Sequence, residues 1–269
     1  MAQLGREWQG AWAVARRNWD LVRRYLGWEV AFLLYNAISA VTIALIGETA
    51  PAAQRAQEVM YLTLGALVWN FLSIIFQEVA SAVTWERWEG TIEVSFMAPL
   101  RRASYLLGTA GYAVGYGLVR TVAVLGAIRL FLPLHLPHPD WAGAVLVLVA
   151  SVLPFVGMGL LGAVLPILST ERGTQATQVI QGVILLVSGV YYPVTVLPGW
   201  VRWLSALSPA TYTLSLSRAA VLQGVPLAEL WRPCLALAAS GLMLVPLGLW
   251  VFHRGEHWAM RRGTLKRSG

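Results

Sequence analysis

WERWEGTIEVSFMAPLRR, residues 85–102, is the densest run of charge between the two ends of an otherwise apolar chain. It holds three carboxylates and three arginines, and apolar segments flank it on both sides. Each flanking segment reaches the length of about 20 residues that a bilayer core requires. A short charged segment between two spans must lie in water, so we expect the spans to hold it against a partner outside the membrane.

The composition excludes a soluble class of protein. The chain has 269 residues, of which 57% are hydrophobic and only 12% charged, whereas a soluble domain carries about 25% charged residues. The net charge is +7, and the Lys and Arg residues gather at the termini and beside the apolar segments. That distribution is typical of a membrane protein and not of a nucleic-acid-binding face. The single cysteine excludes a disulfide within the chain.

We therefore expect an all-α integral membrane protein with six transmembrane helices, at 27–47, 59–80, 104–130, 142–168, 174–191 and 231–252. Residues 192–230 are rich in proline, and neither half of this region is long or apolar enough to cross. It predicts a pair of re-entrant or interfacial helices, whose backbone must be satisfied by protein or water. The expected domains are an amphipathic helix at 1–26, a transmembrane domain at 27–252 and a basic tail at 253–269.

The positive charges predict the orientation in the membrane. The N-terminal segment, 81–103, 169–173 and the tail hold five, three, one and five of the Lys and Arg residues. The loops on the other side hold Arg55, Arg202 and Arg218, with Arg232 at the edge of the last span. Because Lys and Arg accumulate on the cytoplasmic side, we expect a multi-pass protein of the cell membrane with both termini in the cytoplasm.

The N-terminal segment predicts a helix that lies on the membrane surface. Its apolar residues follow a spacing of four and three, which places them on one stripe. They are Trp8, Trp12, Ala15, Trp19, Val22 and Leu26. Basic residues, among them Arg16 and Arg23, lie on other faces, an arrangement that suits the headgroup boundary. The alternative is a soluble helix that packs on a partner.

Two predicted spans carry polar stripes. The second span has Thr63, Asn70, Ser73 and Gln77, and the fifth has Thr174, Gln178, Gln181 and Ser188. Polar side chains in a bilayer face protein or a water-filled path and not lipid. They either line a conduit or join helices through hydrogen bonds, and both roles are compatible at a subunit interface.

The third span contains small residues and one charge. Gly111 and Gly115 form a pair that allows another helix to approach closely. Arg120 lies well inside the span, where a charge is costly unless it pairs or reaches the surface. The sequence names no partner for it.

The charged segment itself predicts a short helix with two faces. Trp85, Trp88 and Ile92 share an apolar face, and acids occupy an adjacent one. These acids are Glu86, Glu89 and Glu93. Such a helix suits docking into a groove on a soluble protein, and the alternative is a solvated loop with boundary tryptophans.

Motifs for catalysis are weak or missing. The sequence has no G-x-x-x-x-G-K-[ST] phosphate loop. His253–His257 spells H-x-x-E-H, but no acid follows Glu256 to complete a zinc site. We expect no metal site and no enzyme activity.

Two segments resemble a known family. Residues 86–102 are similar to the cytoplasmic segment of ABC-2 type transporter permeases, an E-R-E-x-G-T-like run followed by proline and basic residues, although Trp88 stands where a second acid is common. Residues 189–224 resemble the same family's end region, with Pro193, Pro198, Pro209, Tyr212 and Arg218 in order. Together with the six spans and the N-terminal helix, the resemblance covers nearly the whole chain.

The resemblance implies a half-transporter that exports its substrate. Such permeases pair with a second permease copy, identical or different, and bind two copies of a separate ABC ATPase, which carries the ATP and magnesium. This chain would then need no cofactor, and its contacts would be the partners and membrane lipid. The implied ATPase-coupling residues are Trp85, Glu86, Arg87, Trp88, Glu89, Gly90, Thr91 and Glu93, with the N-terminal helix residues Trp8, Trp12, Arg16, Trp19 and Arg23 beside them.

In the resemblance the polar stripes of the second and fifth spans flank the substrate path, and Pro193, Pro198, Pro209 and Tyr212 form an extracellular gate. The stripes carry no strong charge, which favours an amphipathic or hydrophobic substrate such as a drug or lipid. A secondary transporter or channel without an ATPase is the alternative, but it leaves the charged segment unexplained.

Overall fold

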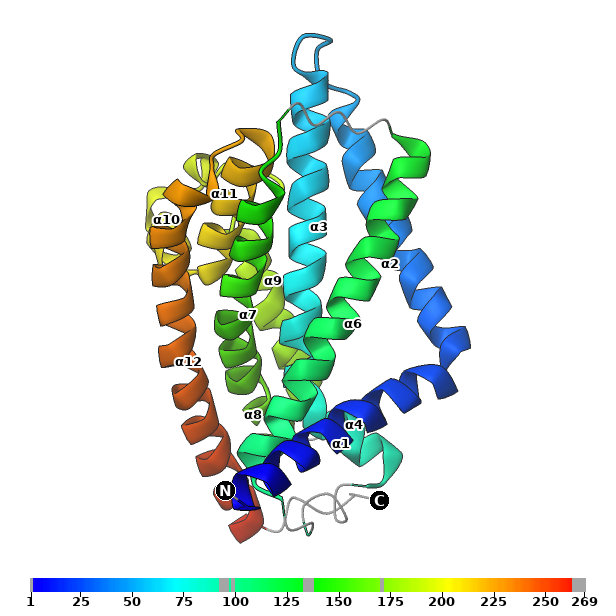
Figure 1. The fold of residues 1–269 in the computed structure, drawn as a ribbon, viewed down its shortest axis with the longest axis vertical. Helices are drawn as coiled ribbons and strands as arrows, with labels where there is room; N and C mark the ends of the chain where they lie inside the picture. Colours follow the sequence, from blue (N-terminus) through cyan, green and yellow to red (C-terminus); the bar gives the residue numbers. More distant parts are fainter. Residues whose placement is uncertain (1, 92–96, 98–99, 133–137, 170–171, 263–269) are drawn as a thin grey trace.

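In the computed structural model the chain is a bundle of helices with one helix laid across one end (Figure 1). The structure describes residues 2–91, 97, 100–132, 138–169 and 172–262. Over these ranges every regular element is helical, and no strand occurs. Within the described residues, five helical segments are long and apolar enough to cross a membrane: α2 (Leu26–Gly47), α3 (Arg55–Ala80), α6 (Arg102–Phe131), α7 (Trp141–Gly162) with α8 (Val164–Leu168), and α12 (Leu227–Arg262).

The remaining helices near the two ends of the bundle are α1 and several short elements. At one end α1 (Ala2–Arg24) runs obliquely across the bundle beside α4 (Ala82–Glu89). Near the other end lie the 3-10 turn η1 (Val194–Val196), α10 (Gly199–Leu207) and α11 (Pro209–Leu222). The expected short helices at 1–26, after the second span and within 192–230 are therefore all present as helices.

The predicted fifth span is shorter than expected. It forms α9 (Gly173–Val187), a helix of 15 residues, which corresponds to about 22 Å at 1.5 Å per residue. A bilayer core is about 30 Å thick. The helix ends before Tyr191 because Gly189 adopts φ +67°, a left-handed conformation that the chain uses to turn toward η1.

Helix α3 forms the centre of the bundle. Of the most apolar 18-residue stretch of this helix, 83% is buried inside the protein. Helix α3 packs against α2, α6, α7 and α11. Phe71, Leu72 and Phe76 contribute its large buried side chains, and Phe155 of α7 joins the same core. The second predicted span is thus surrounded by its own chain.

Helix α2 is attached to the bundle by one half only. Ala40, Val41 and Ala44 are buried against α3 and α6. Toward its beginning, Trp28, Phe32 and Tyr35 are exposed. Figure 1 shows the consequence: α2 diverges from α6 as it approaches α1.

Helix α12 is longer than the predicted sixth span. The span was expected to end at Phe252, but the helix continues to Arg262. Tight packing on α7 supports the membrane part, because Gly157 lies directly against the α12 backbone at Leu244. In the extension, the buried carboxylate of Glu256 accepts a hydrogen bond from Arg102 at 2.8 Å. The segment expected to be a basic tail therefore begins inside a helix.

Candidate functional site

The central feature of the charged segment is α4, which follows α3 after a turn at Ser81. The helix ends at Gly90, whose φ of 72° is the left-handed conformation typical of a helix C-terminus. The Thr91 N–H then donates to the Glu86 carbonyl at 2.9 Å. Gly90 and Thr91 thus close the helix, which explains why this pair follows the charged residues.

The carboxylate of Glu86 is buried, although we expected α4 to display it. Arg17 Nη1 of α1 lies 2.5 Å from Glu86 Oε1, and the Tyr105 hydroxyl of α6 donates to the same oxygen at 3.0 Å. The Thr91 hydroxyl donates to Oε2 at 2.5 Å. The position faces α1 and α6, and a buried carboxylate requires such partners. Burial opposes the charge of Arg17, but Glu86 and Tyr105 together more than offset this, so the pKa of Arg17 is raised.

Arg87 also points into the protein. Its Nη1 donates to the Pro166 carbonyl of α8 at 2.7 Å, and the residue is 9% exposed. Burial lowers the pKa of Arg87. Glu86 and Arg87 together fasten the back of α4 to α1, α6 and α8.

The front of α4 carries the tryptophans. Trp88 is 79% exposed and Trp85 is 45% exposed, and their rings meet edge to face at 5.9 Å. Glu89 is half-buried and accepts a hydrogen bond from the Tyr25 hydroxyl at 3.2 Å. Ile92 and Glu93, which we expected to extend these faces, lie outside the described residues.

The stripe of α1 divides into two parts. Trp8 and Trp12 are exposed, as are the basic residues Arg16 and Arg23. Trp19 instead packs on Tyr112 and Tyr116 of α6, with ring centroids 5.5 and 6.3 Å away. A helix on the surface of the bundle thus uses one end of its stripe to pack on its own chain.

The close approach of α1 to α6 occurs at Gly108. A Cβ there would lie 2.3 Å from the Ala11 carbonyl oxygen. The predicted pair behaves differently, because a Cβ on Gly111 would meet nothing within 4 Å and one on Gly115 would meet only Trp19 at 3.4 Å. Among the described residues it is therefore Gly108, and not the Gly111–Gly115 pair, that allows the close contact.

The polar stripe of α3 is mostly internal. Asn70 donates to the Thr121 hydroxyl of α6 at 3.1 Å, Thr63 is 2% exposed, and Ser73 donates to the Asn70 carbonyl. Gln77 is exposed. The burial of α3 within its own chain leaves Gln77 as the exposed member of this stripe.

The stripe of α9 is more accessible. Gln178 is exposed, and Thr174 and Gln181 are half-buried. Ser188, at the end of the helix, is buried and shares a hydrogen bond of 3.0 Å with Ser208. The polar positions of α9 therefore lie beside an exposed apolar face formed by Val179, Val183 and Leu186.

The predicted gate residues occupy different environments. Pro193 and Pro198 are exposed, Pro209 is buried in the first turn of α11, and Tyr212 is 49% exposed and donates to the Ala206 carbonyl. The residue that fixes this region is Arg218. It donates to the Gly189 carbonyl at 2.9 Å and the Val190 carbonyl at 2.6 Å, and its guanidinium lies 3.6 Å from the Tyr61 ring centroid.

Arg120 has a partner that the sequence could not identify. Its Nη1 donates to the Tyr116 hydroxyl at 2.8 Å, and the Tyr116 hydroxyl donates to the Glu29 carboxylate of α2. Tyr116 lies four positions before Arg120 on the same helix, whereas Glu29 lies 91 positions earlier, so no local pattern could find the carboxylate that completes the chain of hydrogen bonds.

The histidines near the end of α12 form a pair. His253 Nε2 lies 3.0 Å from His257 Nε2, while Glu256 between them bonds Arg102. Among the residues that the structure describes, no group of three His, Cys, Asp or Glu side chains could hold a metal ion.

Comparison with known proteins agrees with this architecture. The sequence model of the ABC-2 type transporter membrane family matches residues 9–222. The chain is also similar to the inner membrane transport permease YadH of Escherichia coli (strain K12), with 26% identity over 155 residues that cover 58% of this chain and 59% of that protein. The YadH of Shigella flexneri matches with the same values. The chain belongs to the ABC-2 type transporter family, as a membrane permease subunit.

Proposed function

We propose that this chain is the membrane half of an ATP-driven exporter, in which two permease copies bind two copies of a separate ABC ATPase. Six helices, α9 included, would cross the membrane, with both termini and α4 on the cytoplasmic side. The positive charges beside α1, α4 and α12 support this orientation. The substrate would be amphipathic or hydrophobic.

The observation that carries the proposal is the two-sided character of α4. Trp88 and Trp85 are exposed in front, and exposed aromatic residues are the side chains that most often anchor an interface. The back of the same helix is fixed by Glu86 and Arg87. A partner that binds the front of α4 would thus be connected through these side chains to α1, α6 and α8.

This connection suggests how ATP could drive movement. When the ATPase subunits close on ATP, they would displace α4. Glu86 would pass the displacement to α1 and α6, and Arg87 to α8. Helix α8 leads through residues 169–172 to α9. The bundle would then alternate between inward and outward arrangements, which a substrate shifts only if it binds the two unequally.

The second permease copy would pack against α9. Its exposed Val179, Val183 and Leu186 form an apolar face with Gln178 beside it. A path between the two copies would then be lined mainly from α9, with Gln77 contributed by α3. Helices α10 and α11 would close this path on the outer side.

Tryptophan pairs at opposite ends of the bundle provide a matched test. Trp85 and Trp88 in α4 and Trp200 and Trp203 in α10 are both exposed i,i+3 pairs. The permease would be purified from membranes that contain its ATPase, as wild type, Trp85→Ala/Trp88→Ala or Trp200→Ala/Trp203→Ala. We expect the α4 variant to lose at least tenfold of the co-purifying ATPase activity and the α10 variant to retain it. Equal retention by both variants would overturn docking on α4, and transport without any ATPase would establish a secondary transporter.

A further inference from the structure

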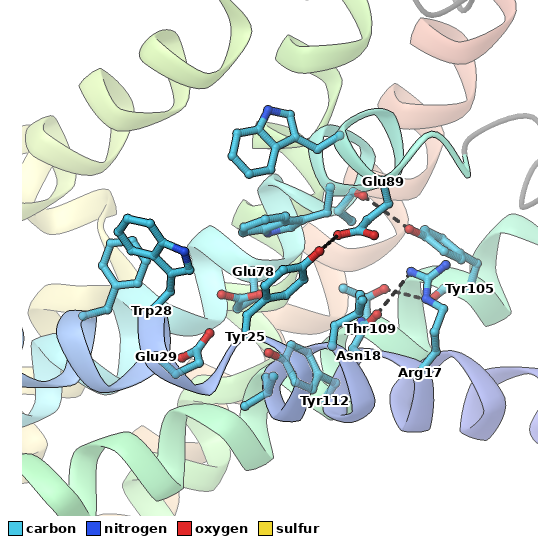
Figure 2. A pocket seen from close by; sticks show the side chains of 16 residues that line it. Arg17, Asn18, Tyr25, Trp28, Glu29, Glu78, Glu89, Tyr105, Thr109 and Tyr112 are labelled. Atoms are coloured by element: carbon cyan, nitrogen blue, oxygen red, sulfur yellow. Dashed lines mark hydrogen bonds between the residues drawn. The ribbon is translucent and has the colours of Figure 1, made fainter.

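A cavity of about 380 Å³ lies where five helices meet. The end of α1, the start of α2, the last turn of α3, α4 and the first half of α6 all contribute lining residues. Figure 2 shows Tyr25, Glu29, Glu78 and Glu89 around this space, with Arg17 and Tyr105 at one side. The cavity holds enough volume for a small organic molecule.

Aromatic side chains form much of its wall. Tyr25, Trp28, Trp85 and Trp88 all line the cavity, and the two tryptophans of α4 meet edge to face. The face of an indole or phenol ring is negative and attracts cations within about 6 Å. Aromatic walls of this kind are suited to an organic cation.

The charged lining is predominantly acidic. Carboxyl groups come from Glu29, Glu78 and Glu89, and the lining has a single guanidinium, that of Arg17. Arg17 is already held by Glu86, which lies 2.5 Å away. Arg120 acts electrostatically on Glu78, but its Nη1 donates to Tyr116 and it is not among the lining residues. A ligand in the cavity would thus meet three carboxyl groups and one guanidinium that Glu86 already engages, so a cation would be favoured over an anion.

Among the described residues, Glu78 is the lining acid without a hydrogen bond or ion pair. By contrast, Glu29 accepts a hydrogen bond from Tyr116 and Glu89 accepts one from Tyr25. A carboxyl group inside a protein is costly unless it is paired. Its position in the cavity wall leaves it available to a ligand.

The position of the cavity favours a ligand with an apolar part. It lies beside the half of α2 that diverges from α6, where Trp28 and Phe32 are exposed. The neighbouring helix α1 has the stripe of a helix that rests at the headgroup boundary. A molecule dissolved in one leaflet could reach the cavity from the side.

We propose that this cavity binds an amphipathic organic cation, an ammonium or phosphonium group that carries apolar substituents. The aromatic rings would hold the cation, and Glu29 and Glu78 would balance its charge. Binding of the cation does not depend on the proposed function; only the statement that the bound cation is a transported substrate rests on it. Two sources share the chemistry: a free lipophilic cation, and the amine headgroup of a phospholipid.

The first test compares two ions of the same shape and opposite charge. Radiolabelled tetraphenylphosphonium and tetraphenylborate would be titrated against the purified permease in uncharged maltoside micelles. We expect the cation to bind and the anion to bind at least tenfold more weakly. Equal binding of both ions would overturn the proposal, because the cavity would then be selecting only apolar bulk.

The second test removes the charges and keeps the shapes. Glu29→Gln/Glu78→Gln should weaken tetraphenylphosphonium binding at least tenfold, while Glu229→Gln, an exposed acid at the start of α12, should leave it unchanged. Trp28→Leu, at a 70% exposed position, provides a variant that should fold normally and bind the cation several-fold more weakly. Unchanged binding in both the Glu29→Gln/Glu78→Gln and Trp28→Leu variants would overturn the site.

A third comparison identifies the source of the ligand. Tetraphenylphosphonium binding would be measured in nanodiscs of phosphatidylglycerol, with and without phosphatidylethanolamine. Competition by the ethanolamine lipid would assign the cavity to a headgroup, and its absence would assign it to free cations. The same co-purification experiment separates the two proposals. If Glu29→Gln/Glu78→Gln loses cation binding but retains the ATPase, the result tests the cavity alone. Whether the α4 tryptophan variant loses the ATPase tests the proposed function.

Discussion

The two ends of the bundle hold their short helices by different chemistry. At the α4 end, ionised partners meet: Arg17 with Glu86 and Arg102 with Glu256. At the α10–α11 end, the partners of the Arg218 guanidinium within the described residues are neutral, namely two backbone carbonyls and the Tyr61 ring. Both ends also hold an arginine of the other kind: Arg87 of α4 donates to the Pro166 carbonyl, and Arg55 pairs with Glu48 between α2 and α3. The contrast therefore concerns the buried carboxylates Glu86 and Glu256, which accept from arginine at the α4 end.

The difference indicates different mechanical roles. A carbonyl of a turn cannot move without the backbone, so Arg218 fixes α11 to the turn after α9. An ion pair joins two side chains, which can exchange partners as helices shift. We infer that the α4 end is built to transmit movement and that the α10–α11 end is built to stay in place. Variants at the two ends should therefore differ in size of effect and in salt dependence.

The largest loss of stability is expected from Glu86→Ala. It removes the acceptor of Arg17, Tyr105 and Thr91. Breaking a buried pair costs about 3–5 kcal/mol, and the lower end applies here because the Arg17 side chain is 38% exposed. Thermal unfolding of the purified protein in detergent would measure the loss. Asp20→Asn is the control, because its pair with Arg23 is exposed on both sides and such pairs contribute under about 1 kcal/mol.

If Glu86→Ala and Asp20→Asn lowered the melting temperature equally, the stability of the α4 end would not depend on its buried carboxylate. The Arg17→Met/Glu86→Ala double variant sharpens the test. If the pair acts as a unit, the double variant should lose much less stability than the two single losses added together.

Next in size is Arg218→Met, at the opposite end. The substitution leaves the Gly189 and Val190 carbonyls without their donor, and hydrogen bonds to charged groups contribute about 1.5–3 kcal/mol. Arg202→Met is the matched control, because Arg202 also donates to two carbonyls but from an exposed position on α10. We expect a clear fall in melting temperature for Arg218→Met and little change for Arg202→Met.

Salt distinguishes the two ends within this same experiment. Screening weakens exposed ion pairs and affects partly buried ones much less. The difference in melting temperature between wild type and Glu86→Ala should therefore shrink only slightly at high salt, through the 38% exposed Arg17 side chain. The difference in melting temperature between wild type and Arg218→Met should not change with salt, because the carbonyl acceptors of Arg218 carry no charge. A loss from Arg218→Met that shrinks as much as that from Glu86→Ala would contradict the division.

A smaller effect is expected where α1 crosses α6. Gly108→Ala would place a Cβ 2.3 Å from the Ala11 carbonyl oxygen, and overpacking of this kind costs about 1–3 kcal/mol. Gly111→Ala, one turn away, meets open space and should stabilise the helix by about 0.5–1 kcal/mol. Thermal unfolding should shift in opposite directions for these two variants. A shift in the same direction would place the helix contact elsewhere.

The membrane helices could be predicted from sequence because their signal is local. Five of the predicted spans coincide with long apolar helices to within a few residues, except that α12 continues past Phe252. Apolar length decides where such helices lie, and no partner is needed to recognise it. The end of α9 could not be placed, because it depends on the conformation of Gly189.

For the charged site around α4, the sequence predicted which segment is involved but not which of its side chains are buried. Glu86 and Glu89 lie three positions apart on α4 and looked equivalent, yet one is buried and the other half-buried. Which carboxylate turns inward depends on Arg17 and Tyr105, and no spacing within α4 reports on those helices. Gly108 was missed for the same reason, since its contact is with α1 and not with a helix that carries a matching motif.

The smallest loss of stability is expected at Asn70, which lies midway between the two ends. Its hydrogen bond to Thr121 joins α3 to α6, and such bonds average about 0.6 kcal/mol in a membrane protein. Asn70→Leu should therefore lower the melting temperature slightly and leave the ATPase activity of the assembled transporter unchanged. Gln77→Leu is the matched partner, because Gln77 belongs to the same stripe but is exposed; it should spare stability and alter the response of the ATPase to added tetraphenylphosphonium. If Asn70→Leu alone changed that response, the path would run through the interior of a single chain, and the burial of α3 would have to be relieved during transport.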